Sequence, residues 1–103
     1  MFEKIEYDIG WMNGCDKILL FITRKCPEGI TAMEISYLFQ MKYSNIHNKL
    51  KRLITNGYLK KIEGKESDGN NKVKILYVAT KKAKKRVNYL MAKHFDNWIP
   101  IPL

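Results

Sequence analysis

Residues 31–59 (TAMEISYLFQMKYSNIHNKLKRLITNGYL) constrain the fold more than any other stretch, because they predict two helices joined by a tight turn. Thr31 and Glu34 have capping-box spacing, in which each side chain bonds the other residue's backbone N–H, so a helix begins here. The apolar stripe of this helix is expected to contain Ala32, Ile35, Leu38 and Phe39.

The second helix of the pair is predicted over about residues 43–56, after a break near residues 40–42. Apolar residues recur at i, i+4, i+7 and i+8 and give this helix one buried face, made of Ile46, Leu50, Leu53 and Ile54. Asn56-Gly57 ends the helix, because glycine readily adopts the left-handed conformation just past a helix end.

The outer face of this second helix is polar and basic. Opposite the apolar stripe lie Ser44, Asn45, Asn48, Lys51 and Arg52, with His47 on the flank and Tyr43 at the start of the helix. Side chains of this kind bond base edges, and the cations among them bond phosphates. No acidic residue occurs between Glu34 and Glu63, and a face without negative charge suits a polyanion. The alternative interpretation is an ordinary solvated helix face.

Length and charge narrow the class of protein. A chain of 103 residues with 46% apolar residues predicts a single folded domain over residues 1–103. Its net charge of +9 indicates an acidic partner, nucleic acid first among them. No apolar run reaches the roughly 18 residues that span a bilayer, and the first residues lack the pattern of a signal peptide. We therefore expect a cytoplasmic, nucleoid-associated protein with no membrane partner.

The segment before this helix pair predicts an arm followed by one helix. Residues 1–12 mix acidic with apolar side chains and are expected to form either a short strand or an arm packed on a partner subunit. Asn13 and Asp16 then resemble an N-cap and an acid in the first turn of a helix over about residues 14–25. Ile30 is either a hydrophobic staple or a very short strand that pairs with a later hairpin.

A basic β-hairpin is predicted after the second helix of the pair. Residues 58–63 (YLKKIE) combine apolar residues with lysines, and residues 73–79 (VKILYVA) are rich in β-branched and aromatic residues. The segment between them is dense in Gly, Ser, Asp and Asn and predicts a long polar loop. Lysines line the hairpin at Lys60, Lys61, Lys65, Lys72 and Lys74.

Thr80 is expected to cap a last helix over residues 80–98. Lys81 and Lys82 occupy its first turn, where the macrodipole disfavours cations; we attribute this to the Lys-rich composition rather than to a nearby anion. An apolar side beyond a small three-helix core suggests a second copy of the chain as partner. The predicted interface consists of Val87, Leu90, Met91, Phe95 and Trp98. The alternative is that this helix packs only on its own core.

Two short motifs carry a resemblance to a known family. Leu53-x-x-x-Gly57-Tyr58-Leu59 is similar to the motif that closes the recognition helix in MarR- and PadR-like regulators. Residues 77–83 (YVATKKA) are similar to their Y-x-L-T-x-x-G motif at the end of the wing, with alanine in place of the usual Leu and Gly. With the element order, the chain resembles a winged helix-turn-helix over about residues 15–95. That α+β fold has a three-helix core, a two-stranded β-hairpin wing and a C-terminal dimerisation helix.

The resemblance implies a homodimeric transcription regulator that binds double-stranded DNA sequence-specifically. One recognition helix per subunit would lie in the major groove, with the wing, about residues 60–78, near the backbone or minor groove. By position, the groove-facing residues would be Tyr43, Ser44, Asn45, His47 and Asn48. The phosphate contacts would be Lys49, Lys51 and Arg52, with wing contacts from Lys65 or Lys72. The last helix of such regulators commonly forms the dimer, which agrees with the apolar side described above.

Other classes of function are weighed against this one. His47 and His94 are isolated in sequence from any carboxylate pair or glycine-rich loop, so we expect neither an enzyme nor a bound cofactor. We interpret His94 as a core or interface residue. Cys15 and Cys26 are the only cysteines and have no metal-ligand spacing, so no metal site is expected. A winged-helix protein–protein interaction module and a non-specific architectural DNA binder remain the alternatives.

Overall fold

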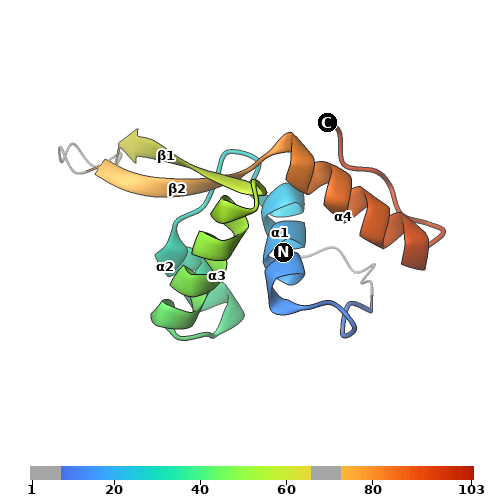
Figure 1. Cartoon of the computed structure of the whole chain (residues 1–103), viewed down its shortest axis with the longest axis horizontal. Helices are drawn as coiled ribbons and strands as arrows, with labels where there is room; N and C mark the ends of the chain where they lie inside the picture. Colours follow the sequence, from blue (N-terminus) through green and yellow to red (C-terminus); the bar gives the residue numbers. More distant parts are fainter. Residues whose placement is uncertain (1–7, 66–72) are drawn as a thin grey trace.

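The computed structural model describes residues 8–65 and 73–103 and places them in an α+β fold. These residues form four helices and one two-stranded antiparallel sheet (Figure 1). In chain order the elements are α1 (Gly14–Lys25), α2 (Ala32–Phe39), α3 (Tyr43–Thr55), β1 (Leu59–Lys65), β2 (Val73–Ala79) and α4 (Lys81–His94).

Side-chain caps begin three of the helices as predicted. The Asn13 side chain accepts a hydrogen bond from the backbone N–H of Asp16 at the start of α1. Thr31 and Glu34 form both bonds of the capping box on α2. Thr80 caps α4 by accepting from the N–H of Ala83, and Gly57 (φ +81°) lies in the left-handed region after α3. The local signals for these boundaries are therefore confirmed.

The core lies where α1 meets the other elements. Ile18, Leu19 and Ile22 on α1 are inaccessible or nearly inaccessible to solvent. They belong to one buried cluster that also includes Ile35, Ile46, Leu50, Leu53, Leu59, Tyr77, Val87 and Met91. The predicted apolar face of α3 is confirmed at its three buried positions, and Ile54 packs half-buried against the same cluster.

The predicted stripe of α2 is wrong at one position. Ala32 and Ile35 are buried, but Leu38 is 46% exposed. Phe39, which the prediction also placed in the stripe, packs edge-on against Phe21 of α1, with ring centroids 5.7 Å apart. Phe39 lies four residues after Ile35 and shares its buried side, whereas Leu38 does not.

The hairpin is anchored to the helices at its base. Strands β1 and β2 pair from Leu59↔Ala79 to Lys65↔Val73, and the hairpin extends away from α2 and α3 (Figure 1). Ile30 forms an isolated antiparallel bridge with Tyr77, with N···O distances of 3.2 and 2.8 Å. The short-strand interpretation of Ile30 is thereby confirmed, and the segment before α2 is tied to β2.

The last helix is shorter than predicted. α4 ends at His94 rather than residue 98, with Phe95 in an extended C-cap conformation. The tail then returns along α4 (Figure 1), where Asn88 holds it. Asn88 Oδ1 accepts from Trp98 Nε1 (3.0 Å) and from the N–H of Ile101 (2.7 Å), and its amide donates to the Ile101 carbonyl (3.0 Å).

This packing corrects the predicted dimer interface. Val87, Met91 and Trp98 are buried in the chain's own core, so they are not available to a second copy. Leu90 and Phe95 are half-buried and remain partly accessible. For these three buried residues, the alternative interpretation, in which the helix packs on its own core, is the correct one.

The described part of the N-terminal arm also packs on its own chain. Met12 is buried, and Ile9 packs against the core. Trp11 stacks on His94 with ring centroids 4.0 Å apart, which fixes the arm against the end of α4. His94 is exposed in this stack, so its interpretation as a core residue is wrong. Residues 1–7 of the predicted arm lie outside the described residues.

Tyr77 gives the fold a pH dependence in the alkaline range. Burial, with a smaller contribution from Tyr43, raises the pKa of Tyr77 above its ordinary value of 10.0. Because the folded pKa exceeds the unfolded one, this stabilisation is complete below pH 10 and is lost as the pH rises through the folded pKa. We expect urea denaturation from about pH 9.5 to 11.5 to show a shallower loss of stability for Tyr77→Phe than for the wild type. The exposed Tyr89→Phe should follow the wild type, and equal pH profiles for the two variants would contradict this prediction.

Candidate nucleic-acid interface

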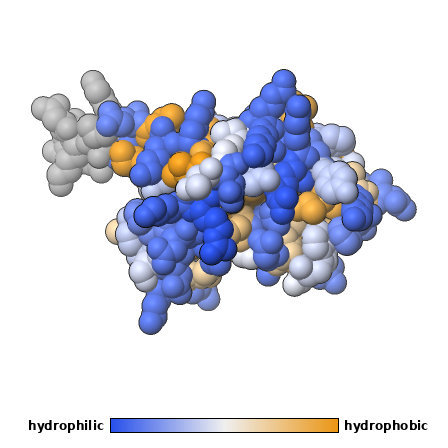
Figure 2. All heavy atoms as spheres, in the orientation of Figure 1, coloured by the Kyte–Doolittle hydropathy of each residue, from blue (hydrophilic) through white to orange (hydrophobic). Residues whose placement is uncertain are grey.

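The exposed face of α3 is a continuous polar surface. Ile46, Leu50 and Leu53 anchor the opposite side of the helix in the core. The outward side chains are exposed at Tyr43, Ser44, Asn45, His47, Asn48, Lys51 and Arg52. Hydrophilic residues dominate the face of the molecule on which α3 lies (Figure 2). The burial pattern that the sequence predicted for this helix is therefore present in three dimensions.

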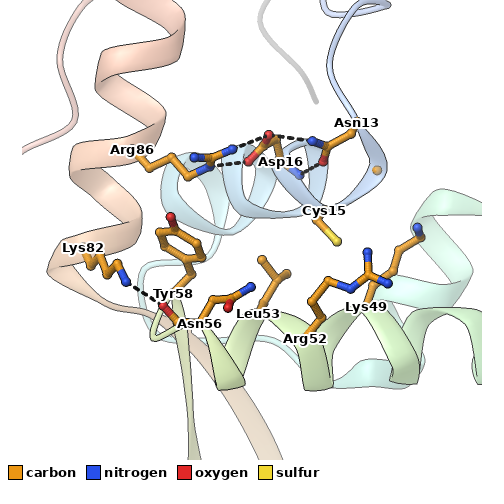
Figure 3. A pocket seen from close by; sticks show the side chains of 11 residues that line it. Asn13, Cys15, Asp16, Lys49, Arg52, Leu53, Asn56, Tyr58, Lys82 and Arg86 are labelled. Carbon is orange, nitrogen blue, oxygen red and sulfur yellow. Dashed lines mark hydrogen bonds and ion pairs between the residues drawn. The ribbon is translucent and has the colours of Figure 1, made fainter.

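The two flanks of α3 differ in chemistry. On one flank the rings of Tyr43 and His47 stack, with centroids 5.6 Å apart and an interplanar angle of 25°. On the other flank Lys49 and Arg52 point toward α1 (Figure 3). The predicted DNA-contacting residues of α3 therefore form an aromatic edge at Tyr43 and His47, a cationic edge at Lys49 and Arg52, and a polar centre between them.

The N-terminus of α3 has no side-chain cap. Lys42 is the N-cap residue, and it makes no side-chain capping bond. No acidic residue lies in the first turn, so the positive end of the helix dipole is not neutralised within α3. The first N–H groups of such a helix are oriented to bond an acceptor outside it, and anions bind readily at positions of this kind.

The strands of the hairpin add positive charge beyond α3. Among their described side chains, Lys60, Lys61 and Lys74 are exposed, against one exposed acid, Glu63. Of the predicted wing contacts, Lys72 lies outside the described residues. Lys65 is described only as the last residue of β1.

A pocket of about 570 Å³ lies between the cationic edge of α3 and the first turns of α1 and α4 (Figure 3). Sequence patterns pointed to Lys49 and Arg52 on its wall, but not to Asp16, Lys82 or Arg86, which line it from α1 and α4. Asp16 and Arg86 are 70 residues apart in sequence, and no local pattern links them.

Two of the pocket cations are engaged in structural contacts. Arg86 forms a double hydrogen bond with Asp16, at 2.8 and 3.1 Å. The hydrogen bonds to Asp16 raise the pKa of the Arg86 guanidinium above its ordinary value. Lys82 Nζ donates to the Asn56 carbonyl (2.8 Å) at the C-terminal end of α3. That bond places Lys82 at the negative end of a neighbouring dipole, which offsets its unfavourable position in the first turn of α4.

Comparisons with known proteins returned no significant match to a protein-family model, a curated protein or a solved structure. Among the helices of the described residues, none combines the length and apolar character needed to cross a membrane. Within the same residues, no group of three or more His, Cys, Asp or Glu side chains is placed to hold a metal ion.

Proposed function

We propose that the chain is a winged helix-turn-helix protein that binds double-stranded DNA, with α3 in the major groove. The observation that carries this proposal is the outer face of α3, which is exposed, polar, cationic and free of acidic side chains while its inner face is fully anchored. The major groove of B-DNA admits an α-helix, and a 13-residue helix presents about 20 Å of length to it.

The distribution of charge around α3 supports the same proposal. Asn45 and Asn48 offer the donor–acceptor pairs that recognise adenine, and Lys51 and Arg52 lie among them as phosphate contacts. The exposed lysines of β1 and β2 would contact the backbone beside the groove.

Regulation of transcription by a homodimer is part of this proposal and rests on the family resemblance alone. The apolar surface left on α4 is smaller than the sequence indicated, because three of the five predicted residues are buried in the core. Leu90 and Phe95, with the exposed Tyr89, are the remaining candidates for contact with a second copy. Sedimentation of Leu90→Lys against the wild type tests this part, since an interface at this position predicts a lighter species for the variant.

The decisive experiment is binding of random duplex DNA across a salt series. We expect the logarithm of the association constant to fall with log salt concentration by about 0.9 per neutralised phosphate. Lys51→Gln should lower this slope by about one unit, because one phosphate contact is lost. Lys93→Gln, in the last turn of α4, removes the same charge away from α3 and should leave the slope unchanged. Absence of binding at low salt would refute the proposal.

A protein–protein interaction module is the second candidate, and one observation favours it. Met33, Tyr37 and Leu38 are exposed within two turns of α2. Apolar side chains grouped on a surface often mark contacts with proteins. A chain that fails to bind duplex DNA at any salt concentration would place this candidate first.

A further inference from the structure

The pocket between α1, α3 and α4 carries positive charge that the fold itself does not neutralise. Four cationic side chains and one carboxylate line it, and that carboxylate, Asp16, is already paired with Arg86. Within the part of the chain that the structure describes, the side chains of Lys49 and Arg52 make no hydrogen bond or ion pair. The charge that Asp16 does not offset belongs to Lys49, Arg52 and Lys82, and of these Lys82 is already bonded to the Asn56 carbonyl.

Lys49 is held against the positive end of another helix. A Cβ atom placed on Gly14, the first residue of α1, would lie only 3.1 Å from Lys49 Nζ. Lys49 is also half-buried, unlike the exposed Lys51 on the same helix. Asn13 and Asp16 already cap and offset the positive end of α1, so the positive potential of this concave site comes from the cationic side chains that line it.

Cationic side chains enter the pocket from α3 and from α4. Arg52 enters from α3 beside Lys49, and both side chains extend from α3 toward the start of α1 (Figure 3). Lys82 lies on the opposite side, over the ring of Tyr58 at 4.9 Å. A guanidinium and an ammonium converging from one side of a pocket form charge-assisted hydrogen bonds with phosphate oxygens.

We propose that this pocket binds a phosphate-class oxyanion through Lys49 and Arg52, with the first turn of α1 as its third wall. The ligand is either a free phosphorylated molecule or a backbone phosphate of bound DNA, because both present the same oxygens. This proposal does not depend on the proposed DNA binding, because the side chains that line the pocket all come from a single chain.

The test is a titration of the 103-residue chain with inorganic pyrophosphate, followed by ¹H–¹⁵N NMR. Saturable shifts are expected at the backbone amides of Gly14, Cys15 and Lys49. Lys49→Gln should weaken pyrophosphate binding about tenfold or more, the effect of losing one charge-assisted hydrogen bond. Lys51→Gln is the matched control, because it removes the same charge from the same helix outside the pocket and should leave the affinity unchanged.

Salt-dependent DNA binding then identifies the source of the oxyanion. If the ligand is a DNA phosphate, Lys49→Gln lowers the salt slope by about one unit and pyrophosphate displaces the duplex. If the ligand is a free phosphorylated molecule, Lys49→Gln leaves that slope unchanged. A chain that binds pyrophosphate here but no duplex would refute the proposed function and support the pocket. Absence of saturable shifts, or equal weakening by Lys49→Gln and Lys51→Gln, would overturn the pocket.

Discussion

Replacing Trp98 by alanine is expected to lower the free energy of unfolding by about 3–5 kcal/mol, the cost of removing a large buried aromatic side chain. Trp98 is 7% exposed and belongs to the core cluster. The Arg24 guanidinium lies over its ring at 4.8 Å, and its indole N–H donates to Asn88. The substitution therefore removes packing, a cation–π contact and the bond that helps hold the tail on α4.

Ile99→Ala is the matched control for this substitution, because Ile99 is the next residue and is 75% exposed. We expect Ile99→Ala to change stability by less than about 0.5 kcal/mol in the same urea denaturation series. Trp98→Phe, which retains most of the volume but loses the N–H, should fall between the two. The loss in Trp98→Ala should not depend on protein concentration. A loss that shrinks on dilution would return Trp98 to an intermolecular interface, because such an interface stabilises the wild type less at low protein concentration.

The starts of the helices were predicted well because their signals act within a few residues. The capping box of Thr31 and Glu34 and the Asn13 cap are complete within one helical turn each, so no distant part of the chain affects them. The periodicity of α3 was equally informative, since its buried positions repeat over the whole helix.

The partner of an apolar helix face was not predictable in the same way. The pattern on α4 marks Val87 and Met91 for burial, and both are buried. It does not say whether the covering surface belongs to the same chain or to another. That answer depends on α1 and on a tail that turns back after His94, which Asn88 holds through three hydrogen bonds.

The candidate site was predictable only in part for a similar reason. The exposed side of α3 follows from the positions of its buried residues, which periodicity provides. The pocket does not follow, because Asp16 and Arg86 meet across 70 residues of sequence. The unfavourable Lys82 in the first turn of α4 was the one local sign of an unusual environment, and its cause is a carbonyl at the end of α3.

Replacing Asn45 and Asn48 together by alanine is expected to reduce discrimination between a selected duplex and random DNA by about 100-fold. The estimate follows from roughly 1–3 kcal/mol for each bidentate contact between a side chain and a base. Both residues are exposed and alanine favours the helix, so thermal unfolding followed by circular dichroism should show no loss of stability. Neither residue is charged, so the salt slope on random DNA should also be unchanged.

Lys51→Gln provides the contrast for this double variant, because it removes a charge from the same face of α3. It should weaken binding to all duplexes alike and lower the salt slope, while discrimination between sequences is retained. The two variants together separate base recognition from phosphate attraction on a single helix. Unchanged discrimination in the double asparagine variant would show that α3 does not read bases through these residues. A non-specific architectural binder would then be the better description, since phosphate contacts alone give no sequence preference.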